Sequence, residues 1–147
     1  MKIIRISTDN EISVHEFPDS SYEEQNHFFR ELIGNNCSIY EHVMPDRLYT
    51  ELHMFDRPSK IPGQCVSMLV DEEGRLKENM PNLIGSYLYR TEQHGCPIMG
   101  NILFVGEKWG EGGIDFCGIE DSVFELLELE LNNLIFTMKA TKEALGK

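Results

Sequence analysis

The chain has 147 residues, of which 41% are apolar and 26% charged, and these proportions suit one globular domain. Its 25 acidic residues outweigh 13 basic ones, and a net charge of −12 with no basic run argues against direct binding to duplex nucleic acid. No apolar run reaches the ~20 residues of a membrane span and the N-terminus lacks a signal-peptide pattern, so we expect a cytoplasmic protein with no membrane partner.

The N-terminal half predicts a hairpin, a helix and two further strands. Ser20 or Ser21 can cap the helix, and Gly34 can end it. The almost wholly apolar run at 65–70 is typical of a central strand, while the stretch 45–63 fits either a helix or a short strand. In chain order we expect strands at 2–6 and 11–15, a helix that ends near residue 33, and strands at 37–44 and 65–70.

The C-terminal half predicts a short helix, a strand, a glycine-rich loop and one long helix, which Asp121 can cap. The expected helices and strand are at 81–89, at 97–105 and from 121 to about 145. The chain is therefore predicted to be a single α+β domain with a small, mostly antiparallel sheet and helices packed on one face. Its expected parts are a sheet-containing core at 1–106, a glycine-rich loop at 107–118 and a C-terminal helix at 119–147.

The apolar residues of the long helix cover more than the one stripe that a surface helix needs. Phe124, Leu129 and Phe136 point away from the face that would pack on the domain. Either the helix is clasped on two sides by its own domain, or it forms a subunit interface. The second interpretation predicts a homo-oligomer. The residues expected to face the domain are Val123, Leu127, Leu131, Leu134 and Met138.

The four cysteines show no metal-binding pattern, because no two of them have C-x-x-C spacing. His94 and Cys96 form a close pair, but no second pair completes a tetrahedral site. We therefore predict reduced thiols, no metal site and no cofactor.

Acidic residues are dense between Glu107 and Glu130, where eight acids stand against the single Lys108. Such a stretch can be a solvated face. It can also be a surface for a basic partner, such as the DNA-binding groove of a nuclease.

Polar and aromatic residues alternate near the middle of the chain. Tyr40 and His42 share one face of a strand, as Tyr49, Glu51 and His53 would if 48–54 were a strand. These residues can line a pocket or simply form a solvated face. Because the sequence carries no nucleophile motif and no paired-carboxylate motif, it does not predict an enzyme. A small hydrolase that uses His42, His53 or Cys96 is the alternative.

Four residues are the candidates for contacting a small anionic ligand. Arg57, in a proline-flanked loop, and Arg90, at a helix end, can supply planar bidentate donors. Tyr40 and Trp109 can supply ring faces for a base. Trp109 lies in the segment Gly106–Gly113, which is too acidic and too far from a helix start to be a phosphate loop.

Several motifs resemble those of a family of short, uncharacterised proteins found in phages, plasmids and conjugative elements of bacteria. The similar segments are Leu69-Val70-Asp71-Glu72-Glu73-Gly74-Arg75-Leu76, Met80-Pro81-Asn82 and Pro97–Gly106. The resemblance covers roughly residues 2–128. It implies a non-enzymatic accessory protein that counters a host defence by binding a small nucleotide-like ligand or a host protein. The alternatives are an acidic DNA mimic that inhibits a nucleic-acid-binding host protein, and a small hydrolase.

Overall fold

The computed structural model describes residues 1–50, 61–77 and 79–145, with side chains as far as residue 141. These residues form a six-stranded antiparallel sheet in the order β2–β1–β5–β4–β3, and β6 pairs with the outer part of β5. The strands are β1 (Lys2–Ile6), β2 (Ile12–Glu16), β3 (Tyr40–Val43), β4 (Val66–Asp71), β5 (Ile102–Gly110) and β6 (Gly113–Cys117). The helices are α1 (Tyr22–Ile33), α2 (Asp46–Thr50), α3 (Leu83–Tyr89), α4 (Thr91–His94) and α5 (Asp121–Leu145), with a 3-10 turn at Gly74–Leu76.

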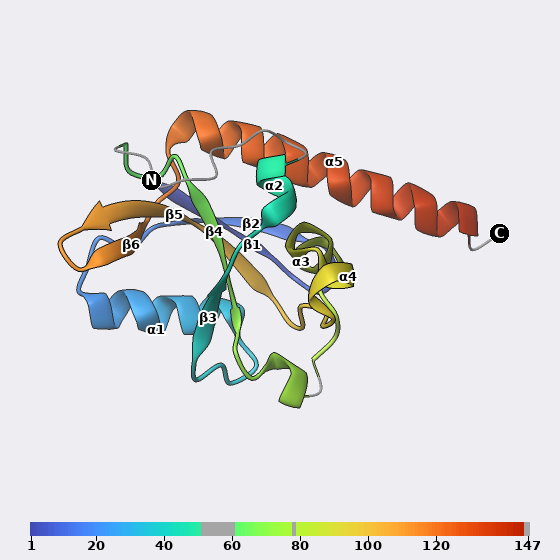
Figure 1. The fold of residues 1–147 in the computed structure, drawn as a ribbon, viewed down its shortest axis with the longest axis horizontal. Helices are drawn as coiled ribbons and strands as arrows, with labels where there is room; N and C mark the ends of the chain where they lie inside the picture. The colour runs from blue at the N-terminus through green and yellow to red at the C-terminus, as the bar shows by residue number, and fades with distance from the viewer. Residues whose placement is uncertain (51–60, 78, 146–147) are drawn as a thin grey trace.

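The predicted α+β class is confirmed, but helices cover both faces of the sheet rather than one. The larger apolar core lies under α3 and α5 and includes Met68 and Phe104. A second core lies under α1 and includes Phe29, Leu69 and Leu103. Figure 1 shows the sheet between α1 and α5. The reason lies in β4, which is buried at all six positions, so both of its faces need a covering helix.

The N-terminal hairpin, α1 and α3 form where the sequence predicts them. Ser21 caps α1 by accepting a hydrogen bond of 3.2 Å from a backbone N–H in the first turn, and Gly34 ends the helix with φ of 74°. Asn82 is fully buried and caps α3, since its Oδ1 accepts from Gly85 N at 2.9 Å. Its Nδ2 also donates to Gly100 O at 3.0 Å, which ties α3 to the segment that leads into β5.

The segment 97–118 differs from the prediction. The strand expected at 97–105 begins at Ile102 and continues to Gly110, and the loop expected at 107–118 forms a hairpin instead. The glycines supply the tight turn, in which Gly113 has φ of 119°, while the residues on either side pair in regular antiparallel register. Glycine content indicated a loop, but only the turn between the two strands uses it.

Three glycines meet at the base of the β5–β6 hairpin. A Cβ atom at Gly106 would lie 2.4 Å from Gly118 O and 2.8 Å from Gly63 Cα. Because no side chain fits at such distances from backbone atoms, this position requires glycine. The close packing fixes the direction in which the hairpin leaves the sheet.

The structure also resolves two ambiguous segments in part. β3 is shorter than the strand expected at 37–44, and α2 shows that 45–63 begins as a helix. Tyr49 therefore lies on a helix and not on a strand. Glu51 and His53 lie outside the described residues.

α5 begins at Asp121, but the side chain that caps it belongs to Glu120. The Glu120 carboxylate accepts hydrogen bonds from the backbone N–H groups of Ser122 and Val123, both at 3.2 Å. Hydrogen bonds from Ser122, led by its hydroxyl, lower the pKa of Glu120.

Phe124 is 8% exposed, which corrects the expectation that it points away from the domain. The Lys2 ammonium lies over its ring, 5.3 Å from the centroid. Leu129 and Phe136 do point outward, with 57% and 74% exposure. Figure 1 shows α5 extending past the edge of the sheet. In the described part of the chain, no helix combines the length and the apolar character needed to cross a membrane.

Candidate ligand-binding groove

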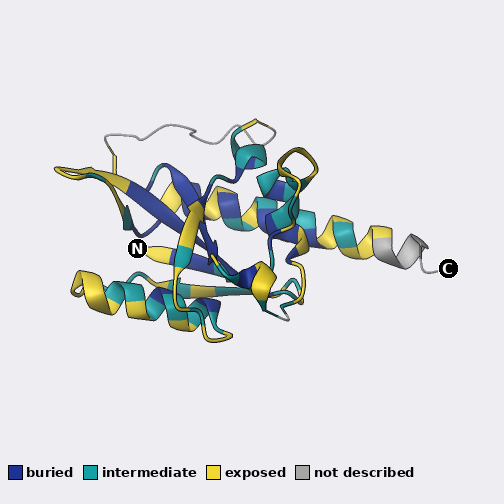
Figure 2. Cartoon of the chain, turned by 60° about the horizontal axis from the view of Figure 1, so that its bottom comes forward, coloured by how far each residue is buried: buried dark blue, intermediate teal, exposed yellow. Residues whose placement is uncertain are grey.

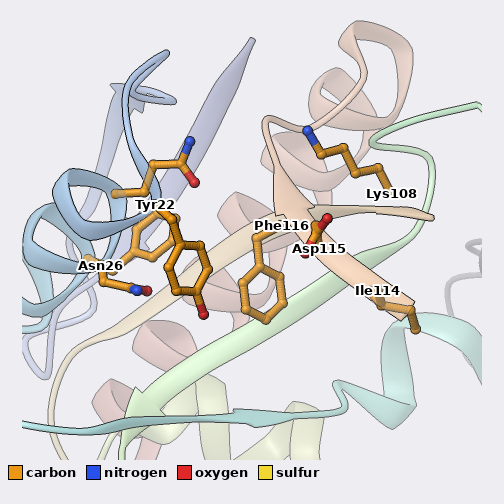
Figure 3. A pocket seen from close by; sticks show the side chains of 8 residues that line it. Tyr22, Asn26, Lys108, Ile114, Asp115 and Phe116 are labelled. Carbon is orange, nitrogen blue, oxygen red and sulfur yellow. The ribbon is translucent and has the colours of Figure 1, made fainter. Parts of the chain in front are cut away.

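A hollow of about 200 Å³ separates α1 from the β5–β6 hairpin. Figure 3 shows Tyr22 and Asn26 of α1 on one side of it and Phe116 of β6 on the other. Phe116 pairs with Glu107 across the hairpin and Ile114 pairs with Trp109, so these four side chains share one face of the hairpin. The lining residues are Tyr22, Gln25, Asn26, Phe29, Lys108, Ile114, Asp115 and Phe116.

On this side of the sheet, α1 presents an aromatic ring, an amide and a guanidinium in one row. Tyr22, Asn26 and Arg30 are spaced by four residues, which places them on one side of the helix. A neighbouring hollow of about 270 Å³ shares Tyr22 and Asn26 with the first and reaches Arg30 and Tyr40. The Tyr40 hydroxyl donates a hydrogen bond to Asn26 Oδ1, and its ring packs edge-on against Phe29 at 5.8 Å. We call the two hollows together the α1 groove.

Two cations, Arg30 and Lys108, flank the α1 groove. Within residues 1–50, 61–77 and 79–141, neither the Arg30 guanidinium nor the Lys108 ammonium has a hydrogen bond or an ion pair. Arg5, by contrast, donates a hydrogen bond to Leu32 O at 2.7 Å. Among the described lining residues Asp115, opposite Lys108 in the hairpin, is the single acid. The groove is thus locally positive in a chain whose net charge is −12.

A separate hollow of about 210 Å³ lies near α4 and is locally negative, unlike the α1 groove. Glu41, Asp71 and Glu72 line it, together with Arg75, whose Nη1 already contacts Cys96 Sγ at 2.6 Å. Three carboxylates against one engaged guanidinium disfavour an anionic ligand there. The α1 groove is therefore the better candidate for one.

A polar cluster of Ser67, Glu107 and His42 lies behind Phe116. Ser67 and Glu107 are buried, whereas the His42 side chain is 36% exposed and its ring is 5.7 Å from that of Phe116. His42 Nε2 is 2.7 Å from Ser67 Oγ and 3.5 Å from Glu107 Oε1, and the Ser67 hydroxyl donates to the same carboxylate oxygen. The Glu107 side chain is only 3% exposed. The hydrogen bond from His42, with further ones from Ser67 and Cys65, keeps the pKa of Glu107 below its usual value, although burial acts in the opposite direction.

This cluster has serine, histidine and glutamate but lacks the geometry of a hydrolase. A catalytic serine must be open to substrate, and the acid must hold the histidine by its other ring nitrogen. Ser67 is fully buried and commits its proton to Glu107, which meets His42 at Nε2, the nitrogen that also contacts Ser67. The cluster therefore satisfies a buried carboxylate.

The neighbouring thiol is also unsuited to nucleophilic chemistry. Burial, as the largest cause, raises the pKa of Cys65 to about 11, so the group stays a thiol near neutral pH. Burial also raises the pKa of Tyr49, whose hydroxyl donates to Val66 O. Of the other residues considered for a hydrolase, Cys96 lies near Arg75 on the α4 side, away from His42, and His53 lies outside the described residues.

The structure brings two of the four predicted ligand residues to the α1 side of the sheet. Tyr40 lines the α1 groove, and Trp109, 60% exposed, lies beside Ile114 at its hairpin wall. Arg90 lies on the other side of the sheet, at the end of α3, where its Nη2 donates to Thr50 Oγ1 at 3.0 Å. Arg57 lies outside the described residues.

Sequence reasoning missed several lining residues, in particular Tyr22, Arg30, Lys108 and Phe116. The four-residue spacing of Tyr22, Asn26 and Arg30 on a predicted helix was a usable signal. Whether Arg30 and Lys108 find partners depends on tertiary structure and has no local signal.

No protein-family model, curated protein or solved structure matches this chain. Within the described residues, no three histidine, cysteine or acidic side chains come together as a metal site would require.

Proposed function

We propose that the protein is a non-enzymatic binding protein whose α1 groove holds a small anionic, nucleotide-like ligand. The observation that carries the proposal is that Arg30 and Lys108, which have no hydrogen bond or ion pair within the described part of the chain, both line the α1 groove. The exposed ring of Tyr22 and the half-buried side chains of Asn26 and Phe116 line the same groove. In an acidic protein such a local reversal of charge favours an anionic ligand over a cationic one.

Each part of a nucleotide has a counterpart in the groove. The rings of Tyr22 and Phe116 offer faces for a planar base, and the Asn26 amide can bond to its polar edge. Arg30 can hold a phosphate through two parallel hydrogen bonds, whereas Lys108 acts as a point charge. Asp115 can accept a hydrogen bond from an amino group on the base.

The biological setting in this proposal follows from the resemblance to proteins of phages and mobile elements. An accessory protein in the cytoplasm that sequesters a nucleotide signal would counter a host defence. A host protein is the other partner that this setting allows. The DNA-mimic alternative is less favoured because Glu107 is buried and Glu120 caps α5, so two of the eight acids between 107 and 130 have structural roles.

Self-association is part of the same proposal. The outward-facing side chains of Leu129 and Phe136 are large, apolar and exposed on α5. Burying them against another subunit would remove them from water.

The test is binding of a nucleotide panel, with mononucleotides, cyclic mononucleotides and cyclic dinucleotides as probes, by thermal shift and calorimetry. A ligand at 100 times its dissociation constant should add about 2.7 kcal/mol to the free energy of unfolding. Arg30→Ala should weaken binding by about 10-fold or more, because a hydrogen-bonded charge is lost. Lys139→Ala is the matched control, since Lys139 is an exposed cation on α5, away from the groove.

Two results would contradict the proposal. One is that no probe shifts the unfolding temperature at millimolar concentration. The other is that Arg30→Ala and Lys139→Ala bind equally well, which would move the ligand site elsewhere.

A further inference from the structure

The outward side of α5 carries a regular row of exposed residues. Leu126, Leu129 and Phe136 are 41%, 57% and 74% exposed, and the exposed residues Asn133 and Ala140 complete the row. The spacings of three, four, three and four residues are those of a coiled-coil seam. We call this row the α5 seam; at 1.5 Å per residue it is about 21 Å long.

The charges beside the α5 seam distinguish the two ways in which a second α5 could lie on it. In a heptad with the seam at positions a and d, Glu125 and Lys139 occupy g positions and Glu130 an e position. A parallel pair places Glu125 beside Glu130 of the partner subunit, which is repulsive. An antiparallel pair places Glu125 beside the partner subunit's Lys139, which is attractive.

The charge of the whole helix favours the same orientation. Residues 121–132 contain four acids and no base, whereas residues 133–145 contain two lysines and one glutamate. An antiparallel pair therefore sets the acidic half of each helix against the weakly basic half of the other. A parallel pair would set the two acidic halves together.

We propose that a second copy of this chain packs antiparallel on the α5 seam, with the two-fold axis near residues 132–133. In an antiparallel pair each a position packs against d positions of the partner helix, so overlap of the two seams buries Leu129 and Phe136 between the helices. The part of α5 that extends past the sheet in Figure 1 then lies along the other helix. The inference rests on the proposed self-association and is independent of the α1 groove.

The first experiment is sedimentation velocity across a concentration series, with circular dichroism to check folding. The wild-type chain should be a dimer at micromolar concentration. Leu129→Glu should raise the dimer dissociation constant by about 10-fold or more without loss of helix signal. Leu76→Glu is the matched control, because Leu76 is 86% exposed but lies outside α5, and it should leave the dimer unchanged.

The second experiment tests orientation by exchanging charges. Glu125→Lys and Lys139→Glu should each raise the dissociation constant by about 2- to 10-fold, and the double variant should restore it. In a parallel dimer Glu125→Lys would instead tighten association, because it would face Glu130 of the partner subunit.

The possible outcomes distinguish self-association, the use of the α5 seam and the antiparallel arrangement. A wild-type monomer would overturn both the self-association and this inference. A dimer that Leu129→Glu does not weaken would leave self-association standing and overturn the α5 seam. A dimer that Glu125→Lys strengthens would overturn the antiparallel arrangement.

Discussion

The two faces of the sheet use the same strands for different purposes. Under α3 and α5, β4 and β5 present an uninterrupted apolar core that includes Met68 and Phe104. Under α1 the same strands are apolar at Leu69 and Leu103. They are polar at Ser67 and Glu107, near the point where the hairpin leaves the sheet. Figure 2 shows this change as dark blue strands that give way to an exposed hairpin tip. One face serves mainly stability, and the other has space for a groove.

The largest loss of stability should come from replacing a phenylalanine in the core under α3 and α5. Phe104 is fully buried, so Phe104→Ala should lower the free energy of unfolding by ~3–5 kcal/mol, because it loses apolar burial and leaves a cavity. Phe116→Ala, on the groove face, should lower it by about 1 kcal/mol. Urea denaturation of both variants measures the difference. Equal losses would show that the two faces contribute alike to stability.

An intermediate effect is expected in the buried polar cluster. Ser67→Ala removes a hydroxyl that donates to the Glu107 carboxylate, and the resulting loss should be ~1–3 kcal/mol. The matched control is Ser13→Ala on β2, where a serine also contacts a histidine, His15, at 2.9 Å but no buried carboxylate depends on it. That variant should change stability by less than about 0.5 kcal/mol. A Ser67→Ala loss as small as the control's would mean that the carboxylate does not need this bond.

The smallest effect is a change in pH dependence. Because hydrogen bonds lower the pKa of Glu107 in the folded state, the unfolded chain binds this proton more readily. The contribution of Glu107 to stability is therefore present above the ordinary glutamate pKa and is lost as the pH falls through the lowered one. Glu107→Gln should remove this component, so its stability should fall less than that of wild type between neutral and acidic pH. Urea titrations at several pH values test this, and parallel curves would show that Glu107 does not titrate as described.

Local signals predicted most of the elements, and long-range pairing decided the rest. Ser21, Gly34 and Asn82 act as caps where the sequence suggests, because capping depends on a few neighbouring residues. β6 was missed because its identity as a strand depends on pairing with β5 and on the contact between Gly106 and Gly118. Phe124 was misplaced because a stripe calculated from α5 alone cannot show that Lys2 of β1 lies over the Phe124 ring at the start of the helix.

The candidate site was predictable only in part, for the same reason. Tyr40 and Trp109 were identified as aromatic residues in polar surroundings, and they do lie on the α1 side of the sheet. Arg90 was an equally good candidate from its sequence context, but α3 carries it to the opposite side. Arg30 and Lys108 become candidates only once the tertiary structure places both beside the α1 groove.

A backbone amide NMR titration with guanosine monophosphate and a cyclic dinucleotide tests whether the α1 groove binds a small anionic ligand. We expect saturable shift changes concentrated in residues 22–30 of α1 and 108–116 of the hairpin, and we expect Arg30→Ala to abolish them. Shift changes centred on α4 and the 3-10 turn at Gly74–Leu76, or none with either nucleotide, would show that the α1 groove is not the ligand site.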